Sequence, residues 1–281
     1  MLRLAIRVRR EDAELVLAEL LELAPGGVEE VELGDAIEYA VYGAPGELPT
    51  LPDLRAAAGA ALVDVSTREI ADDWAERWRE FHRPLVLGDA ITVRPPWEPP
   101  GDTRIDVVID PGQAFGTGAH ASTRLCLELM GDASRPLGVG LAANIPGALG
   151  PFLDLGCGSG VLSIVAARLG WAPVTAVDYD DASVQAARAN AAANGAAVDV
   201  RRLDVRTDPL PEAPTVAANL LSPLLIALAP RIGAARPRHV IASGILTREA
   251  GDVAQAFAAS GLTVSARRER GEWAALLLAG V

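Results

Sequence analysis

The sequence predicts an α/β protein made of a small α+β domain and a larger domain with a doubly wound, mainly parallel sheet. Two observations predict the larger domain. Apolar strand-like and helix-like segments alternate after residue 150, and the run Gly156-Cys-Gly-Ser-Gly160 joins the first such strand to the first such helix. A third observation predicts the smaller domain, because residues 1–66 follow the order β-α-β-β-α-β of a ferredoxin-like fold. The length of 281 residues is enough for both.

The small domain is expected over residues 1–66, where the apolar periodicity changes repeatedly between that of strands and that of helices. Residues 2–8 alternate apolar with basic side chains, and residues 11–23 have a helical period that Pro25-Gly26-Gly27 ends. Gly34-Asp35 indicates a hairpin turn. The expected elements are strand 2–8, helix 11–23, strands 28–33 and 36–41, helix 52–58 and strand 61–65.

Residues 67–100 are expected to connect the two domains. Trp74, Trp78 and Phe81 are spaced i, i+4 and i+7, which places them on one face of a helix over residues 70–81. Two tryptophans also suit a stacking platform for nucleic-acid bases, but the charged, acidic helix favours simple packing. We therefore interpret this helix as the segment that docks the small domain onto the large one. Residues 84–100 are expected to be a strand and irregular chain.

The large domain is expected over residues 101–281 as a Rossmann-like sheet. A Gly- and Pro-rich stretch over residues 131–150 is interpreted as a surface loop. Because the last two strands follow one another without a helix, they predict an antiparallel edge. The expected strands are 105–109, 152–155, 174–178, 198–202, 215–219, 239–243, 262–268 and 273–278, and the expected helices are 122–130, 161–169, 181–194, 223–232 and 248–259.

The composition excludes several classes of protein. The formal net charge of −12 argues against nonspecific nucleic-acid binding, which needs Lys and Arg to neutralise phosphates. Cys126 and Cys157, with only three histidines in the chain, do not make a zinc site, so no metal is expected. The sequence shows no signal peptide and no apolar span of about 20 residues, which predicts a cytoplasmic protein without membrane contact.

Residues 151–178 carry the strongest functional signal. An apolar strand leads into the three alternating glycines Gly156, Gly158 and Gly160, and a second strand ends at Asp178, 22 residues after Gly156. In nucleotide-binding α/β units such glycines let the backbone approach the ligand, and an acid about 20 residues further on binds the ribose hydroxyls. A tight strand-to-helix turn without any ligand would explain the glycines, but it would not explain the acid.

The glycine pattern also indicates the kind of cofactor. Dinucleotide enzymes use G-x-G-x-x-G and hold a pyrophosphate at a helix N-terminus. Here the pattern is G-x-G-x-G, and Asp154 precedes it. A carboxylate at that place repels a pyrophosphate but attracts the ammonium group of a methionine moiety. We therefore expect S-adenosylmethionine rather than NAD.

Several runs along the chain together resemble the ribosomal protein L11 methyltransferase family, which belongs to the class I S-adenosylmethionine-dependent methyltransferases. The first run is much more specific than the glycine pattern, which all class I methyltransferases share. The resemblance covers nearly the whole chain. The runs are Asp110-Pro-Gly-Gln-Ala-Phe-Gly-Thr-Gly-Ala-His120, Asp154-Leu-Gly-Cys-Gly-Ser-Gly160, Ala218-Asn-Leu-Leu221, Ser243-Gly-Ile-Leu246, Asp73-Trp74 and Gly271-Glu-Trp273.

The resemblance implies methyl transfer from S-adenosylmethionine to amines of a large-subunit ribosomal protein, L11, at lysine side chains and at the N-terminal α-amine. It also implies that the first domain recognises this substrate, and it maps the cofactor positions onto Thr123, Gly156, Asp178 and Asn219. The chain departs from the usual Thr-His-x-Thr-Thr pattern with Ala119-His120-Ala121-Ser122-Thr123, which loses one hydroxyl. The 131–150 stretch is longer than usual.

The candidate side chains near the strand ends have distinct expected roles. Asp178 holds the ribose, and the glycines, Gly158 among them, let the backbone approach the methionine portion. Asn219 is the expected catalytic residue, since its amide orients the amine by hydrogen bonding, although Asn is also common in turns. Three roles stay open. Asp204 either accepts from the adenine amine or is a solvated loop acid, Thr123 either contacts the cofactor or caps a helix, and His120 either contacts the substrate or packs. Phe115 is expected to cover the cofactor as a lid.

Three rival functions remain at this point. Methyltransferases that act on nucleic-acid amines commonly have Asn-Pro-Pro-Tyr where this chain has Asn219-Leu-Leu-Ser222, which offers no ring to stack on a flipped base. The other two rivals are a noncatalytic S-adenosylmethionine-binding module and an NAD-dependent oxidoreductase. We expect the ribosomal protein as the partner, no direct nucleic-acid specificity, and a monomer. No general base is evident, so water is expected to take the proton of the amine.

Overall fold

The computed structural model describes residues 2–13, 16–17, 20, 23, 28–43, 48–69, 83–110, 120–134 and 149–280. The chain has two compact units, Met1–Phe81 and His82–Val281. The helix expected over residues 70–81 and most of the loop expected over residues 131–150 lie outside the described residues. In the part of the chain that is described, no helix is both long and apolar enough to span a membrane.

The first unit has a four-stranded antiparallel sheet in the order β2-β3-β1-β4, as expected for a ferredoxin-like unit. Residues 13, 16, 17, 20 and 23 are helical, and the Tyr39 hydroxyl donates to the carbonyl oxygen of Ala13 at 2.9 Å. Alternate β1 residues Leu4, Ile6 and Val8 form the core with Tyr39, as the period of two requires. The elements are β1 (Leu2–Arg9), η1 (Arg10–Asp12), β2 (Glu29–Leu33), β3 (Ala36–Gly43), α2 (Leu51–Ala58), η2 (Gly59–Ala61) and β4 (Leu62–Glu69).

The second unit begins with a small three-stranded sheet. Strands β5 (Leu85–Leu87) and β6 (Ile91–Arg94) are antiparallel, and β6 pairs in parallel with β7 (Ile105–Val108). Arg94 fixes this sheet by a double hydrogen bond to the Asp106 carboxylate. The second unit begins at His82, inside the stretch expected as a connector over residues 67–100, and β5 and β6 lie within that stretch. Strand β4 extends past residue 66, where the first domain was expected to end.

The main sheet has seven strands in the order β10-β9-β8-β11-β12-β14-β13. All neighbours from β10 to β12 are parallel, and β14 runs antiparallel between β12 and β13, which confirms the expected α/β fold and its antiparallel edge. The strands are β8 (Phe152–Leu155), β9 (Val174–Asp178), β10 (Val198–Arg202), β11 (Thr215–Asn219), β12 (His239–Leu246), β13 (Leu262–Arg270) and β14 (Trp273–Gly280).

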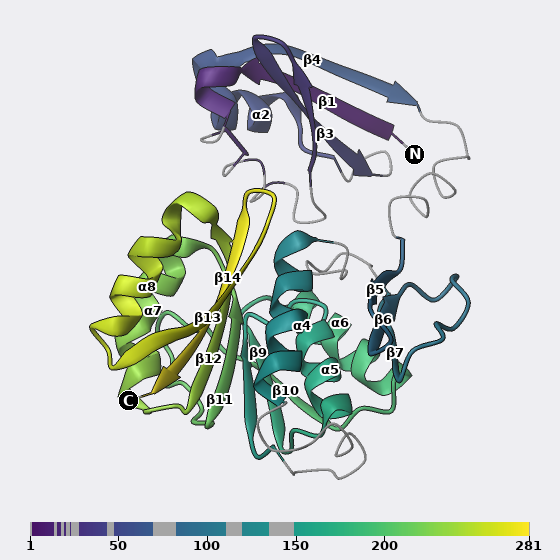
Figure 1. Cartoon of the computed structure of the whole chain (residues 1–281). Helices are drawn as coiled ribbons and strands as arrows, with labels where there is room; N and C mark the ends of the chain where they lie inside the picture. Colours follow the sequence, from purple (N-terminus) through teal and green to yellow (C-terminus); the bar gives the residue numbers. More distant parts are fainter. Residues whose placement is uncertain are drawn as a thin grey trace. The chain divides into compact units, whose positions relative to one another are not determined.

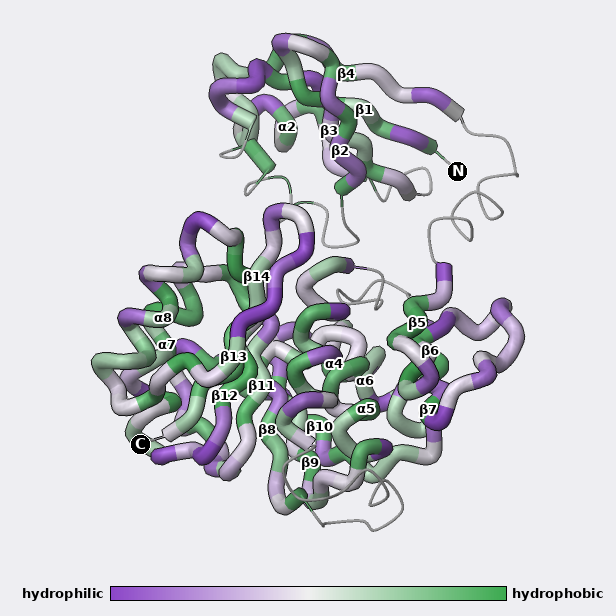
Figure 2. The backbone as a smooth tube through the Cα atoms, in the orientation of Figure 1, coloured by the Kyte–Doolittle hydropathy of each residue, from purple (hydrophilic) through white to green (hydrophobic). Residues whose placement is uncertain are grey.

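Helices cover both faces of this sheet. Helices α4, α5 and α6 lie on one face, and α7 and α8 lie on the other (Figure 1). The outer strand β13 is mostly exposed, whereas its neighbour β14 is mostly buried, and Figure 2 shows the corresponding change in hydropathy. The helices are α4 (Ala121–Ser134), α5 (Val161–Leu169), α6 (Asp181–Ala193), α7 (Ser222–Ala234), η5 (Thr247–Glu249) and α8 (Ala250–Ala258).

This topology determines where a ligand binds. From β8 the chain proceeds through β9 to β10 on one side, and β11 and β12 lie on the other side of β8. Ligands of open α/β sheets bind beyond the carboxyl ends of the strands, at the point where the order reverses. The adjacent strands β9, β8 and β11 end there with Asp178, the turn after Leu155, and Asn219.

Candidate functional site

The turn after β8 needs its glycines for two physical reasons. Gly156, Gly158 and Gly160 all have positive φ angles, of 73°, 50° and 81°, which L side chains rarely adopt. A Cβ on Gly156 would lie 2.6 Å from Cδ2 of Leu220, and a Cβ on Gly160 would lie 3.1 Å from Cβ of Ala187. The glycines therefore serve the turn itself, as the ligand-free interpretation of the sequence allows, and they also let Leu220 and Ala187 pack directly against it.

Asp178 is fixed across this turn by backbone donors. Its side chain is buried, at 7 % exposure, at the carboxyl end of β9. The Gly158 N–H donates to Oδ2 at 2.9 Å, and the Asp180 N–H donates to Oδ1 at 3.1 Å. Each carboxylate oxygen accepts more than one hydrogen bond, so both keep a lone pair for a ligand. A ribose diol presents two hydroxyl donors with suitable spacing.

Asp154 is fully buried beneath the same turn. Its Oδ2 accepts from the Ser163 hydroxyl on α5, and its Oδ1 has no hydrogen-bond partner among the described residues. Burial raises the pKa of this carboxyl group to about 7, because desolvation disfavours the charged form. A buried acceptor with no partner is costly, and Oδ1 is shielded from solvent, so the carboxyl group can act on a ligand above the turn through its charge rather than by direct contact.

Asn219 and Thr123 come together although they are 96 residues apart in the sequence. The Asn219 Nδ2 donates to Thr123 Oγ1 at 3.3 Å, and the Thr123 side chain is fully buried in the first turn of α4. The Asn219 side chain is half-buried at the end of β11, and its Oδ1 makes no hydrogen bond with any described residue. One end of the amide is therefore anchored, and the other end is available to a donor.

Strand β12 supports Asn219 through the run Ser243-Gly-Ile-Leu246. The pairing of β12 with β14 is shifted between Ala242 and Ile245, which is a bulge at Ser243 and Gly244. Gly244 has a φ of 82°, and a Cβ there would lie 2.6 Å from the Leu220 carbonyl oxygen and 3.1 Å from the Asn219 Oδ1. The Ser243 hydroxyl donates to the Ser122 carbonyl oxygen at 2.8 Å. The bulge therefore lets β12 approach both Asn219 and the start of α4.

His120 caps and packs the start of α4. The Ser122 N–H donates to its Nδ1 at 3.2 Å, and the Ser122 hydroxyl lies 2.7 Å from the same nitrogen. Its ring contacts Trp273 edge to face, with the ring centroids 4.6 Å apart. Burial lowers the pKa of His120, so the ring is neutral at pH 7. The sequence left two roles open for His120, substrate contact and packing, and these contacts are those of packing.

Beside Asp178, three further side chains form a connected group. Asp204 accepts three hydrogen bonds from the Arg206 guanidinium, which lower the pKa of its carboxyl group. The same guanidinium lies 5.3 Å from the centre of the Tyr179 ring, and Tyr179 is 62 % exposed. Tyr179 was not among the side chains that the sequence singled out, although it directly follows Asp178. Phe115 lies outside the described residues.

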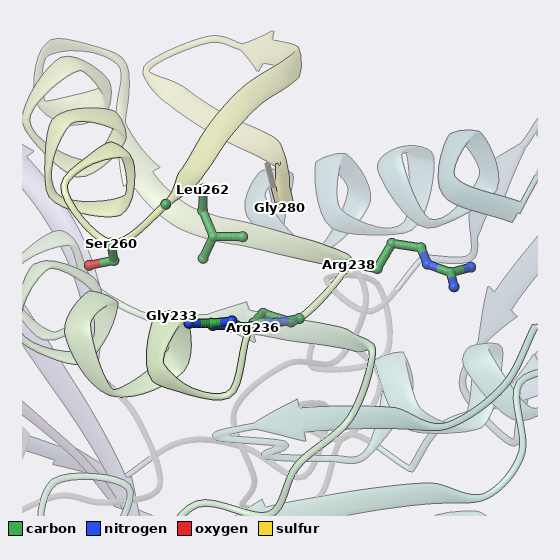
Figure 3. A pocket seen from close by; sticks show the side chains of 8 residues that line it. Gly233, Arg236, Arg238, Ser260, Leu262 and Gly280 are labelled. Atoms are coloured by element: carbon green, nitrogen blue, oxygen red, sulfur yellow. The ribbon is translucent and has the colours of Figure 1, made fainter.

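A surface hollow lies at the opposite end of the strands and is separate from this site. It lies between the end of α7, the start of β13 and the end of β14 (Figure 3). Since β12 begins next to it, at His239, the hollow lies at the amino end of that strand. Among the described residues, no group of three or more His, Cys, Asp or Glu side chains is placed to hold a metal ion. The hollow is lined by Gly233, Arg236, Pro237, Arg238, Ser260, Gly261, Leu262 and Gly280.

Comparison with known proteins gives one consistent result. The family model described as ribosomal protein L11 methyltransferase (PrmA) matches residues 52–279. A ribosomal protein L11 methyltransferase of Pelotomaculum thermopropionicum is 41% identical over 219 residues, which are 75% of this chain and 67% of that protein. One of Geobacter sulfurreducens is 38% identical over 239 residues, 81% of this chain and 73% of that protein. The crystal structure of a ribosomal protein L11 methylase from Lactobacillus delbrueckii subsp. bulgaricus has a TM-score of 0.59 and 26% sequence identity, and the match covers 71% of this chain and 99% of that one.

Proposed function

Because this chain belongs to the ribosomal protein L11 methyltransferase family, we propose that it transfers methyl groups from S-adenosylmethionine to amines of ribosomal protein L11. The acceptors are the ε-amines of lysine side chains and the N-terminal α-amine. The observation that carries this proposal is the anchored amide of Asn219. Asn219 ends β11 and Asp178 ends β9, and the strand between them, β8, leads into the glycine turn. The amide provides an amine-binding group at the edge where the methyl donor is expected to lie.

The residues at the strand ends fit S-adenosylmethionine. The Asp178 carboxylate, fixed by two backbone N–H groups, has lone pairs for the ribose hydroxyls. Gly156, Gly158 and Gly160 carry no side chains that would keep the methionine portion away from the turn. The ionised carboxylate of Asp154, buried beneath the turn, attracts the ammonium group of the methionine moiety through its charge. The exposed ring of Tyr179 provides a surface for the adenine beside the ribose acid.

When bound, the sulfonium supplies an electrophilic methyl group for direct displacement by the amine. The protein must align the nitrogen, the methyl carbon and the sulfur, and good alignment is worth up to about 7–11 kcal/mol. We assign this task to Asn219, whose Oδ1 accepts an N–H of the amine while Thr123 holds the opposite end of the amide. The nitrogen lone pair then points away from Asn219.

The amine must be neutral before it reacts. A lysine in water has a pKa near about 10.4 and an α-amine near about 7.8, so lysine carries the larger deprotonation cost. A partly apolar wall lowers the pKa of a lysine by desolvation, and Leu220 and Leu221 directly follow Asn219. His120 is committed to capping and packing α4, so water is the proposed proton acceptor.

Substrate recognition is assigned to the first domain, residues 1–66. Its sheet is formed independently of the methyltransferase sheet, which leaves it available for a separate task. The net charge of −12 supports a protein partner rather than nucleic acid, and the proposed active form is the monomer. Analytical ultracentrifugation at micromolar concentration tests the monomer, and a sedimenting dimer would overturn it.

The decisive experiment is mass spectrometry of purified ribosomal protein L11 incubated with the enzyme and isotopically labelled S-adenosylmethionine. The chain contains no lysine, so every labelled methyllysine must come from the substrate. We expect labelled methyl groups on lysines and on the N-terminus of L11. If the enzyme binds the cofactor but labels no ribosomal protein, the proposed function is wrong and a noncatalytic binding module is favoured. Tight binding of a nicotinamide dinucleotide would favour an oxidoreductase.

A further inference from the structure

Two buried asparagines lie one turn apart on α6, outside the set of site residues. Asn190 is 3 % exposed and Asn194, directly after the helix, is 7 % exposed. Buried amides persist where their hydrogen bonds are satisfied, and both are satisfied here by backbone groups far away in the sequence. The two side chains nevertheless bind different parts of the chain.

Asn190 joins the glycine turn to the end of β7. Its Nδ2 donates to the Ser159 carbonyl oxygen, inside the turn, at 2.9 Å. Its Oδ1 accepts from the Asp110 N–H, two residues after β7, at 3.0 Å. The two partners are 31 and 80 residues from Asn190 along the chain. A single amide therefore fixes the distance between two segments that are far apart in the sequence.

Helix α6 also contacts the other parts of the site. Its N-cap, Asp180, donates its backbone N–H to the Asp178 carboxylate. Ala187, one turn before Asn190, has its Cβ only 3.1 Å from the position that a Cβ of Gly160 would occupy. The helix therefore begins at the ribose acid and lies directly against the glycine turn, and Asn190 adds the polar contact between them.

Asn194 is a natural control because it makes more hydrogen bonds but touches no site segment. Its Oδ1 accepts from the Val108 N–H at 2.9 Å, and its Nδ2 donates to the carbonyl oxygens of Val108 at 2.6 Å and Asn190 at 2.8 Å. The two bonds to Val108 join α6 to β7, and the bond to Asn190 stays within the end of the helix. If the asparagines were merely structural, loss of Asn194 would do at least as much damage as loss of Asn190.

We propose that Asn190 is a positioning residue for S-adenosylmethionine, acting through the glycine turn whose carbonyl group it holds. This inference rests on the proposed use of that turn by the methyl donor. The amide is required because Asn190 must donate to one segment and accept from the other at the same time, and an amide is the smallest side chain that carries a donor and an acceptor on separate atoms. A carboxylate at this position would still accept from Asp110 but would repel the Ser159 carbonyl oxygen.

The test compares Asn190→Ala with Asn194→Ala in the full-length chain. The dissociation constant for S-adenosylmethionine is measured by calorimetry at a temperature at which both variants are folded, and each melting temperature is recorded. We expect both melting temperatures to fall, the dissociation constant to rise at least tenfold in Asn190→Ala, and the constant to stay within twofold of wild type in Asn194→Ala. Hydrogen exchange at the Asp110 amide should accelerate in Asn190→Ala, which reports loss of the bridge without any cofactor.

Asn190→Asp covers the case in which Asn190→Ala fails to fold, since it keeps the side-chain volume and the bond from Asp110. It should also raise the dissociation constant at least tenfold, because the carboxylate loses the bond to Ser159 and repels its carbonyl oxygen. Equal dissociation constants in the Asn190 variants and wild type would overturn the inference, as would an equal rise in Asn194→Ala. If wild-type protein does not bind S-adenosylmethionine at all, the proposed function itself is wrong.

Discussion

At the scale of single residues, Asp178 has the most direct consequence for cofactor binding. Its carboxylate is buried and held by two backbone N–H groups, and it is proposed to bind the ribose, so its replacement should remove charge-assisted hydrogen bonds to that sugar. Asp178→Ala should weaken S-adenosylmethionine binding by about 1–3 kcal/mol, measured by calorimetry. Asp199→Ala is the matched control, because Asp199 is an exposed carboxylate on the neighbouring strand β10. Unchanged affinity in Asp178→Ala would argue against a ribose contact.

Asn219 should affect turnover more than cofactor affinity. Its Oδ1 is proposed to orient the amine, so Asn219→Ala loses an interaction that matters at the moment of transfer, and kcat should fall by roughly 100-fold. Thr123→Val keeps the shape of the side chain but leaves the amide unanchored, and we expect a smaller fall in the same direction. Steady-state kinetics with L11 and calorimetry with the cofactor separate the two quantities. A variant whose cofactor affinity falls while kcat is kept would make Asn219 a cofactor ligand only.

Asp154 predicts a pH dependence of cofactor binding. Burial raises its pKa to about 7, so the group is largely protonated at pH 6 and largely ionised above pH 7.5. If the ammonium group of S-adenosylmethionine binds the ionised form, affinity should rise roughly fivefold to tenfold from pH 6 to 7.5, below the loss of the ligand's own charge near pH 8. Calorimetry should show proton release near pH 7, and Asp154→Asn should abolish both effects. A flat profile in wild type would refute an effect of the Asp154 charge on the bound ammonium group.

The same pKa shift has a consequence for the stability of the protein without cofactor. The folded form holds this proton more tightly than the unfolded chain, whose aspartates titrate near about 3.9. The stabilising contribution is therefore complete below about pH 4 and is lost as the pH rises through about 7. The melting temperature of wild type should therefore decline between pH 5 and 8, whereas that of Asp154→Asn should not. The melting temperature of the variant minus that of wild type should grow with pH.

Residue-scale inference from the sequence succeeded where spacing carries the information. The interval from Gly156 to Asp178 predicted two residues that the structure brings to adjacent strand ends. The family resemblance assigned Thr123 and Asn219 to the same cofactor site, but their direct hydrogen bond could not be predicted, because no local pattern relates residues 96 positions apart. Asn190 escaped notice for the same reason, since an asparagine in a helix has no periodicity that reveals a partner 80 residues away.

At the scale of elements, the bulge in β12 predicts a clear difference between two glycines. Gly244 and Gly261 have almost equal φ angles, 82° and 81°, but a Cβ on Gly244 would clash with the Leu220 carbonyl oxygen, whereas one on Gly261 meets nothing within 4 Å. Each Ala substitution should cost about 1–3 kcal/mol for the backbone conformation. Gly244→Ala should lose more stability than Gly261→Ala and should lower kcat, because it displaces the end of β11. Equal melting temperatures and equal kcat would show that the bulge does not support Asn219.

Most helices and strands of the described chain can be predicted from apolar periodicity and from the Gly and Pro residues that end them. Strands β8, β9, β10 and β11 have the expected bounds, because long alternation of apolar strands and helices leaves little choice of register. Strands β5 and β6 were not recognised as a sheet, because they are only 3 and 4 residues long and are surrounded by prolines. Such short strands are stabilised by pairing, β5 with β6 and β6 with β7, and their own sequence pattern is too short to indicate them.

At the scale of the whole molecule, the two units predict separable functions. Met1–Phe81 and His82–Val281 each have their own core, and every strand-end residue assigned to the cofactor lies in the second unit. A chain that begins at His82 should therefore keep its affinity for S-adenosylmethionine within about threefold of full-length protein, since this binding depends on no described residue of the first unit. It should lose methylation of L11 by at least about 100-fold, because the recognition energy that positions the amine at Asn219 is gone.

A short lysine peptide at millimolar concentration is the control substrate, and we expect both chains to methylate it at similar slow rates. If the truncated chain still methylates L11 at the full rate, recognition lies in the second unit. If it loses cofactor binding as well, the second unit does not fold alone, and charge-reversing substitutions on the exposed face of the first unit, such as Arg7→Glu, are the appropriate test.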